Sequence, residues 1–589
     1  MDWTSYDSQL EEALLISKQT PTQEQPYEHL YKSRKILDVD DKHRCEYGRL
    51  CYLLGINFYD TDEPSFADRR LISAINIIAD KNSSDKNLDT LKHSTRPKED
   101  NEDDYEADGI NNNSTTPIDI QYIHILADSY NYLGMLWTSR NEPKRSERYL
   151  RKAEEIYSYY KKCQDSEQGP KVTSERTIKR MEELHTLTTF YLAQVYGFLK
   201  LPVNAAQYCY LTLVRQLESK LDLNKFDWTS NCLQLAGFLL NEKHFATCEH
   251  FIAAAEYMLS GVEQEDQSSE TYQSIVANLE MAKSRLYQEH LTSSKEYVMT
   301  EQSKTNEDFE TILSTLSLTE LPKTTIEPRS QLPSFVFPTD LLPVAAPKPF
   351  YYLRTFEEAL SVFKKGKKAA ENSLKYYVLD GFVTEHIANL ENLSHMYKLI
   401  AFFEPDIDRK WCVAMQKRRA DLLSSILNQL NVEIYSSTLK QISFELGEMY
   451  SDVWDLLYKR AKADIKNGKK STPVNRINET ALHSVKYLSR FVSLFEDSKT
   501  KQLKVEEENI PAYIRGRLMI ARLYYHMTHN DTELLVRYLT ASLKEYETIV
   551  EFAKKQNPEH LVGVQQEVDM AKQMIRLLPT KIKEERGLK

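Results

Sequence analysis

Apolar and small residues recur along the chain with one spacing that is found four times. Each copy has a Leu followed by a small residue. A large side chain lies three residues after the small one. Counted from the same small residue, a second small residue follows at position twelve, a mostly apolar residue at sixteen and a third small residue at nineteen. The copies are Leu54-Gly55, Phe58, Ala67, Leu71, Ala74; Leu133-Gly134, Trp137, Ser146, Leu150, Ala153; Leu192-Ala193, Tyr196, Ala205, Cys209, Thr212; and Leu235-Ala236, Leu239, Cys248, Ile252, Ala255.

This spacing indicates pairs of antiparallel helices. Two helices approach closely only where small side chains face each other, and bulky residues three or four positions away fill the flanking grooves. The same arrangement is typical of tetratricopeptide (TPR) repeats, which the four copies resemble. The pattern therefore predicts an all-α protein, a TPR-like α-solenoid in which antiparallel helix pairs form a right-handed superhelix. Leu446-Gly447 with Tyr450, and less clearly Ala521 with Tyr524, extend the pattern towards the C-terminus.

The repeats depart from a regular period. Their small residues lie 79, 59 and 43 positions apart, so other segments are inserted between the pairs. The first insertion, 81–117, has no apolar face, and its core at 99–108 carries seven carboxylates in ten residues. Such a composition predicts a disordered acidic loop.

Prolines suggest a division into two halves. Seven of the twenty prolines fall between Pro322 and Pro349, where helical periodicity fades. A continuous helix cannot pass through such a segment. We therefore predict an N-terminal half at 1–292 with about four helix pairs, a Pro-rich linker at 293–349 and a divergent helical half at 350–589. A long helix at about 272–299 would precede the linker and close the first half.

Composition narrows the classes of function. The chain has only 15 glycines among 589 residues, which disfavours nucleotide-binding loops. A net charge of −11 disfavours nucleic acid and anionic membranes as partners. Seven scattered cysteines without a CxxC pair fit a reducing compartment. The N-terminus lacks the features of a signal peptide, and no apolar run is long enough for membrane insertion. We therefore expect a cytoplasmic protein.

No pattern of residues indicates catalysis. The chain has no GxGxxG, GxxxxGK[ST], HExxH or GxSxG motif. His526 and His529 could share one face of a helix as metal ligands, but two solvated histidines at a helix end are the simpler interpretation. We therefore predict no catalytic residues, no metal and no cofactor. The alternative of a helical hydrolase predicts a bound metal ion, which elemental analysis of the purified protein would detect.

The first helix of each pair is expected to line the inner face of the solenoid. Counted from the small residue of each copy, the positions six and three before it and one after it should point inward. They are Asp128, Asn131 and Met135; Leu187, Phe190 and Gln194; and Ser230, Leu233 and Gly237. This mixture of apolar and amide side chains suits a folded partner or an amphipathic helix better than a peptide carboxylate. Phe190 and Leu233 are more simply interpreted as core residues, whereas the polar residues Asn131 and Gln194 are candidate contacts.

The chain resembles a known family, the kinesin-binding proteins, also called KIF-binding proteins. The resemblance is carried by Tyr191 to Tyr196, Arg215 to Glu218, Trp228 to Ala255, Asp380 to Ile387, Tyr397 to Glu404, Gln416 to Arg419 and Leu577 to Lys581. It implies a two-part solenoid whose groove captures the motor domain of selected kinesins. The captured helix would be the one with which the motor grips microtubules, so motor and track could not bind together. The resemblance also implies association with the cytoskeleton and roles in neuronal and mitochondrial transport.

The resemblance also implies contact residues. Tyr191 and Gln194 match the family in the first helix of the third copy, and Gln216 lies in its second helix or just after it. Gln234 stands where neighbouring residues diverge. Together with Asn131, these form the predicted partner-binding set. An adaptor that bridges two other proteins remains the alternative function. The sequence leaves the oligomeric state open, and a monomer is the working expectation.

Overall fold

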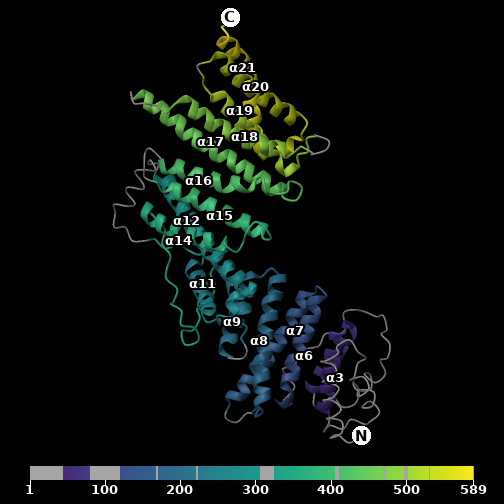
Figure 1. The fold of residues 1–589 in the computed structure, drawn as a ribbon. Coiled ribbons are helices and arrows are strands. Elements are labelled where there is room, and N and C mark those ends of the chain that lie inside the picture. The colour runs from purple at the N-terminus through teal and green to yellow at the C-terminus, as the bar shows by residue number, and fades with distance from the viewer. Residues whose placement is uncertain are drawn as a thin grey trace. The chain divides into compact units, whose positions relative to one another are not determined.

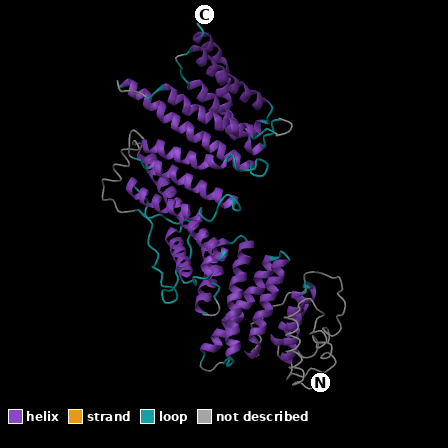
Figure 2. Cartoon of the chain, in the orientation of Figure 1, coloured by secondary structure: helices purple, strands orange, loops and turns teal. Residues whose placement is uncertain are grey.

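A computed structural model describes residues 44–79, 120–166, 170–219, 223–305, 324–404, 410–467, 472–496, 502–529 and 531–587. Within these ranges the chain is helical and contains no named strand, only two isolated bridges, Thr325 with Tyr351 and Glu496 with Leu503 (Figure 2). The predicted all-α solenoid is therefore confirmed. The acidic insertion predicted at 81–117 lies outside the described residues. No helix in the described ranges is long and apolar enough to cross a membrane.

By its internal contacts the chain divides into two units. The first comprises residues 1–267 and 328–348, and the second comprises 268–327 and 349–589. Helices of the first unit are α3 (Arg44–Asp60), α4 (Pro64–Ala79), α6 (Ile123–Ser139), α7 (Pro143–Asp165), α8 (Glu175–Phe198), α9 (Pro202–Glu218), α10 (Lys225–Asn241) and α11 (Phe245–Ser260). Consecutive helices pack as the antiparallel pairs α3/α4, α6/α7, α8/α9 and α10/α11, which Figure 1 shows in chain order.

The second unit continues the same architecture with longer helices. They are α12 (Glu270–Thr305), α14 (Phe356–Ser373), α15 (Val383–Phe402), α16 (Lys410–Ile426), α17 (Ser436–Lys466), α18 (Val474–Ser493), α19 (Ile510–His526), α20 (Thr532–Lys554) and α21 (Gln565–Glu585). Helix α12 packs on both α14 and α15, and α15/α16, α17/α18 and α19/α20 form pairs.

In three helix pairs, a glycine of the first helix packs directly against a leucine of the second helix. An ideal Cβ on Gly134 would come within 2.5 Å of the Leu150 side chain, and one on Gly55 within 2.7 Å of Leu71. Gly447 has the same relation to Leu488, at 2.5 Å. In two of these pairs a serine of the second helix also donates to the glycine carbonyl of the first: Ser146 Oγ to Gly134 at 2.7 Å and Ser484 Oγ to Gly447 at 2.6 Å. The spacing in the sequence thus reflects one repeated helix contact.

The four pairs of the first unit also share one turn. The seventh residue after each small residue has a positive φ of 58–61°, namely Asp62, Asn141, Lys200 and Lys243. The backbone amide of the residue after this positive-φ residue donates to a carbonyl in the last turn of the first helix. In the second pair, for example, Glu142 donates to Trp137 at 2.9 Å. In three pairs the second helix then begins with proline, whose fixed φ suits a first helical position. Identical turns give the four pairs the same local geometry.

The boundary between the units differs from the prediction. The predicted long helix exists as α12 but spans Glu270–Thr305, and it belongs to the second unit, not to the first half. Leu291 and Val298 of α12 are fully buried in one cluster with Phe363 and Met396. The division therefore falls after Gln267 instead of after residue 292, because the apolar face of α12 packs on α14 and α15.

Part of the predicted linker is packed in an ordered way against the first unit. Residues 328–348, here called the strap, form neither helix nor strand and carry Phe335 and Phe337, both at most 2% exposed. The Phe337 ring lies 4.8–5.7 Å, centroid to centroid, from the rings of Tyr210, Trp228, His250 and Phe251. Prolines exclude a helix here, as predicted, while the buried aromatic side chains hold the strap against α9–α11.

His250 fastens the strap through both ring nitrogens. Its Nε2 accepts the Phe337 amide hydrogen at 3.0 Å, which leaves Nδ1 as the donor to the Ala345 carbonyl at 2.9 Å. Only the neutral ring can do both. Burial lowers the pKa of His250 in agreement with that requirement. His244 also reaches the strap, through Nε2 and the Ser330 carbonyl at 2.8 Å, but a donating nitrogen stays a donor when the ring is protonated.

The strap should therefore loosen in acid. In a detached strap His250 regains an ordinary pKa of about 6.5, so below that pH the detached form binds a proton that the docked form excludes. Docking is at full strength above about pH 6.5 and weakens as the pH falls towards the lowered pKa. Hydrogen exchange of residues 328–348 at about pH 7.5 and about pH 5.5, corrected for intrinsic rates, measures this. His250→Gln should weaken protection at both pH values and remove the difference between them. Equal protection of the wild-type strap at both pH values would contradict the assignment.

The helix contact at Gly134 gives a second prediction. Gly134→Ala should lower the free energy of unfolding by about 1–3 kcal/mol, because the new methyl group overlaps Leu150. Gly197→Ala is the matched control, since nothing lies within 4 Å of its ideal Cβ; it should leave stability unchanged or raise it by up to about 1 kcal/mol through helix propensity. Urea unfolding followed by circular dichroism measures both. Equal effects of the two substitutions would exclude close packing as the cause.

Candidate functional site

Solvent-accessible side chains on the first helices of the first unit form a repeated face. Relative to the small residue of each pair, the positions two before, one after and five after are at least partly exposed in α6, α8 and α10. We call these the first-helix face: Tyr132, Met135 and Ser139; Tyr191, Gln194 and Phe198; and Gln234, Gly237 and Asn241. Offsets of three and seven residues place each trio on one side of its helix.

Aromatic side chains of α3, α6 and α8 lie on this face or in contact with it. The Tyr59 and Tyr132 rings meet edge to face with centroids 5.4 Å apart, and Tyr191 meets Phe190 in the same way at 5.4 Å. All four side chains are half-buried. Tyr191 is close enough to Tyr59 and Tyr132 for their charges to influence the titration of these groups. Within the described residues, no hydrogen bond is made by the hydroxyls of Tyr59, Tyr132 and Tyr191, which we call the tyrosine row.

Burial sets the protonation of these phenols. It raises the pKa of Tyr191, and nearby Tyr59 and Asp128 add to the increase. Burial likewise raises the pKa values of Tyr59 and Tyr132. The three hydroxyls are therefore neutral near pH 7, and each can donate one hydrogen bond and accept others.

A charged network lies beneath the tyrosine row. Asp128 of α6, 3% exposed, accepts from the Tyr52 hydroxyl of α3 at 2.6 Å and from Arg180 of α8 at 2.7 Å. One carboxylate thus links three first helices. Because a buried carboxylate without partners is costly, the network holds α3, α6 and α8 in register beneath the face.

Asn131 does not lie on this face. It is 1% exposed, its amide nitrogen donates to the Leu184 carbonyl at 3.2 Å, and its oxygen accepts from Thr188 at 2.8 Å. Asp128 is buried as well. The expected accessibility of Asn131 is therefore wrong, because a residue three positions before Gly134 points into the α6/α8 interface and not to solvent.

The other predicted contact residues fall into two groups. Tyr191 and Gln194 lie together on the exposed side of α8. Gln234 is exposed on α10, at the position that corresponds to Tyr191, and α10 packs on α9. Gln216 lies elsewhere, near the C-terminus of α9. Its neighbour Arg215 binds Glu182 at 2.8 Å, and Glu182 is nine residues, or roughly 13 Å along α8, before Tyr191.

The surroundings of Arg215, the neighbour of Gln216 in the chain, are polar and incompletely satisfied. Glu182 accepts from Tyr157 at 2.7 Å and from Arg215, and the His185 ring stacks on Tyr157 at 3.6 Å. Burial lowers the pKa of His185 to about 3, so the ring is neutral. The Gln216 Oε1 and the His185 Nδ1 are buried without hydrogen-bond partners. This patch is distinct from the first-helix face.

Some residues of the first-helix face were not predicted. Tyr132 stands two positions before Gly134, as Tyr191 stands two before Ala193, so aligning the copies at that offset would have found it. Phe198 is 63% exposed. Its exposure could not be seen in the sequence, where an aromatic residue near a helix end is most simply taken as core.

Among the described residues, no group of three or more His, Cys, Asp or Glu side chains is placed so that it could hold a metal ion. His526 instead packs against Trp454, with ring centroids 5.8 Å apart. His529 Nδ1 accepts the Asp531 amide hydrogen at 2.9 Å. The arrangement of aromatic, amide and hydroxyl groups on the first helices is suited to binding another macromolecule.

Comparison with known proteins agrees with this architecture. A family model described as "KIF-1 binding protein C terminal" matches residues 226–584, more than half of the chain. The chain belongs to the KIF-binding protein family. KIF-binding proteins from Gallus gallus and Homo sapiens are 28% and 29% identical over 78% of this chain, covering 80% and 77% of their own lengths. The protein of the same name from Drosophila melanogaster is 26% identical over 77% of both chains.

Solved structures show the same fold. A structure titled kinesin binding protein aligns with 98% of this chain and 99% of its own at a TM-score of 0.58 and 22% identity. A second, titled as a cryo-EM map of KIFBP, covers 100% and 99% with a TM-score of 0.62 and 19% identity. The helical solenoid is thus shared across the family despite low sequence identity.

Proposed function

We propose that this chain binds the motor domains of selected kinesins through the first-helix face and so keeps them from attaching to microtubules. The observation that carries the proposal is the tyrosine row, whose hydroxyls have no partners in the described structure, together with exposed Gln194 and Phe198 on α8. Membership of the family and the printed names of its members support kinesins as the partners.

The composition of the face fits a helical partner. Tyrosine offers rigid apolar area with a polar end, and such residues are enriched among those that contribute most to binding. Phe198 and half-buried Phe190 add apolar area, and Gln194 can donate and accept hydrogen bonds at once. An amphipathic helix laid across this face would place apolar side chains against the rings and polar ones against the hydroxyls and amides.

Competition explains how binding would inhibit movement. A motor holds its track with a defined helix, and a face that covers this helix excludes the track without any chemical step. The net charge of −11 is compatible with a motor surface that must also bind acidic microtubules. In this proposal the chain acts in the cytoplasm, as a monomer and without a cofactor.

Replacement of Tyr191 and Gln194 by alanine should weaken motor binding by roughly 10- to 100-fold, since two central contacts of about 1 kcal/mol or more each are removed. The measurement is the dissociation constant for a panel of purified kinesin motor domains. Tyr257→Ala with Gln207→Ala is the matched control. It removes an exposed tyrosine and an exposed glutamine from the second helices α11 and α9 of the same unit, and it should bind like wild type.

Microtubule co-sedimentation separates binding from inhibition. Wild-type protein should move a sensitive motor from the pellet to the supernatant, and the Tyr191/Gln194 variant should not at the same concentration. Unchanged affinity of that variant would refute the site. Wild-type protein that binds a motor yet co-sediments with it on microtubules would refute the blocking step alone.

A further inference from the structure

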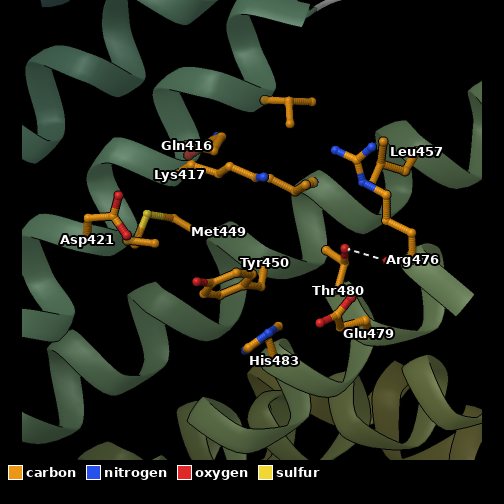
Figure 3. A pocket seen from close by; sticks show the side chains of 13 residues that line it. Gln416, Lys417, Asp421, Met449, Tyr450, Leu457, Arg476, Glu479, Thr480 and His483 are labelled. Atoms are coloured by element: carbon orange, nitrogen blue, oxygen red, sulfur yellow. Dashed lines mark hydrogen bonds between the residues drawn. The ribbon is translucent and has the colours of Figure 1, made fainter.

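A cavity in the second unit lies outside the first-helix face. It has a volume of about 310 Å³ and lies between α16, α17 and α18. Figure 3 shows its side chains converging from these three helices. A volume of this size is at the lower end of the range of ligand pockets, enough for one or two side chains of a bound peptide.

Two cationic side chains approach each other across the cavity. Lys417 extends from α16 and Arg476 from the start of α18, with their charged ends directed towards one another (Figure 3). Neither side chain has an ion pair or hydrogen bond within the described parts of the chain. Both side chains are solvent-exposed, and an anion placed between their charged ends would be attracted by both. Lys and Arg side chains form charge-assisted hydrogen bonds with carboxylates.

Gln416 adds a donor on the same wall. Its side chain is 6% exposed, and its Oε1 accepts from the buried Arg419, which is itself held by Glu445 at 2.6 Å. The Gln416 amide nitrogen, which has no partner among the described residues, is left available to the cavity. The Arg419 bonds fix α16 against α17, so Gln416 and Lys417 are held in place.

The remaining surface is apolar and aromatic. Met449 and Val453 of α17 are at most 4% exposed and form the floor with partly exposed Leu457. The Tyr450 ring is stacked with His483 at 5.2 Å and with Tyr487 at 5.6 Å. An anionic group at Lys417 and Arg476 would therefore have an apolar neighbour packed over this floor.

Two carboxylates limit what the anion can be. Asp421 and Glu479 also line the cavity, apart from the two cations in the view of Figure 3. They would repel a compact polyanion such as a phosphate ester. A peptide can place one carboxylate between the two cations. Its backbone N–H groups can donate hydrogen bonds to Asp421 and Glu479. The mixed charge of the cavity therefore favours a peptide.

We propose that the cavity between α16, α17 and α18 binds a peptide segment of a partner protein, with a peptide carboxylate held between Lys417 and Arg476 and an adjacent apolar side chain over Met449, Val453 and Tyr450. The carboxylate comes from an acidic side chain or from a peptide C-terminus. This site is independent of the first-helix face and of the motor-binding proposal.

Three fluorescein-labelled heptapeptide pools test the proposal by fluorescence anisotropy with the full chain. The first pool has a central Glu, flanking positions drawn from Leu, Val, Thr, Ser and Tyr, and an amidated C-terminus. The second replaces Glu with Gln, and the third is the Gln pool with a free C-terminal carboxylate. The Glu pool, the free-carboxylate pool or both should bind about tenfold or more tightly than the amidated Gln pool.

Charge-removing variants locate the binding. Lys417→Met and Arg476→Met should each weaken binding of the preferred pool by about tenfold. Arg418→Met is the matched control, because Arg418 is the exposed neighbour of Lys417 on α16 but does not line the cavity; it should bind like wild type. Circular dichroism checks that the variants fold.

Preference for the Glu pool assigns an acidic side chain, and preference for the free-carboxylate pool assigns a peptide C-terminus. Equal binding of all three peptide pools would overturn the proposal. So would an equal loss of binding in the Lys417, Arg476 and Arg418 variants. So would the absence of binding by any pool at millimolar protein. None of these outcomes bears on motor binding through α8, so the two proposals fail separately.

Discussion

The close contact between a small residue on one helix and a large apolar residue on the next is the constraint on which the rest of the structure depends. At Gly134 and Leu150 the helices are so near that not even a methyl group fits between them. The contact fixes the distance and rotation of the pair, and the turn seven residues later and the start of the second helix follow from it. It also decides which residues reach solvent: with Gly134 turned towards Leu150, Tyr132 and Met135 must lie on an accessible side of α6.

Polar groups between the pairs then complete what the apolar contacts begin. Asp128 joins Tyr52 and Arg180 across three helices, and Asn131 uses both ends of its amide at Leu184 and Thr188. Such bonds add little net energy, but leaving any of these groups unpaired would be costly, so they favour one register of α6 against α8. A face assembled from separate helices can present a defined pattern of side chains only if that register is kept.

The sequence predicted the helix pairs, because the contact that forms them leaves a spacing of small and large residues, as at Gly55 and Leu71. The offsets placed Gln194 on the accessible side of α8, whereas Tyr191, which lies beside it, was indicated only by the family resemblance. They did not separate Asn131 from Gln194, since a polar residue facing a neighbouring helix and one facing solvent look alike when the crossing of α6 and α8 is unknown. The place of α12 was missed for a related reason. An amphipathic helix shows that it has a partner but not which one, and Leu291 packs with Phe363, more than seventy residues away.

Two groups of tyrosines in the first unit differ in whether their hydroxyls are hydrogen-bonded within the described residues. Tyr157, Tyr196 and Tyr208 donate to Glu182, Glu147 and Glu154 at 2.7–3.0 Å, so their rings are fixed by the fold itself. The tyrosine row has rings that are equally fixed by packing, yet no hydrogen bond satisfies its hydroxyls within the described residues. Stability does not require these hydroxyls, because phenylalanine would fill the same space. The fold positions these phenols but does not use their hydroxyls, which leaves the hydroxyls available to a partner, and this is the ground for proposing that α3, α6 and α8 take part in binding.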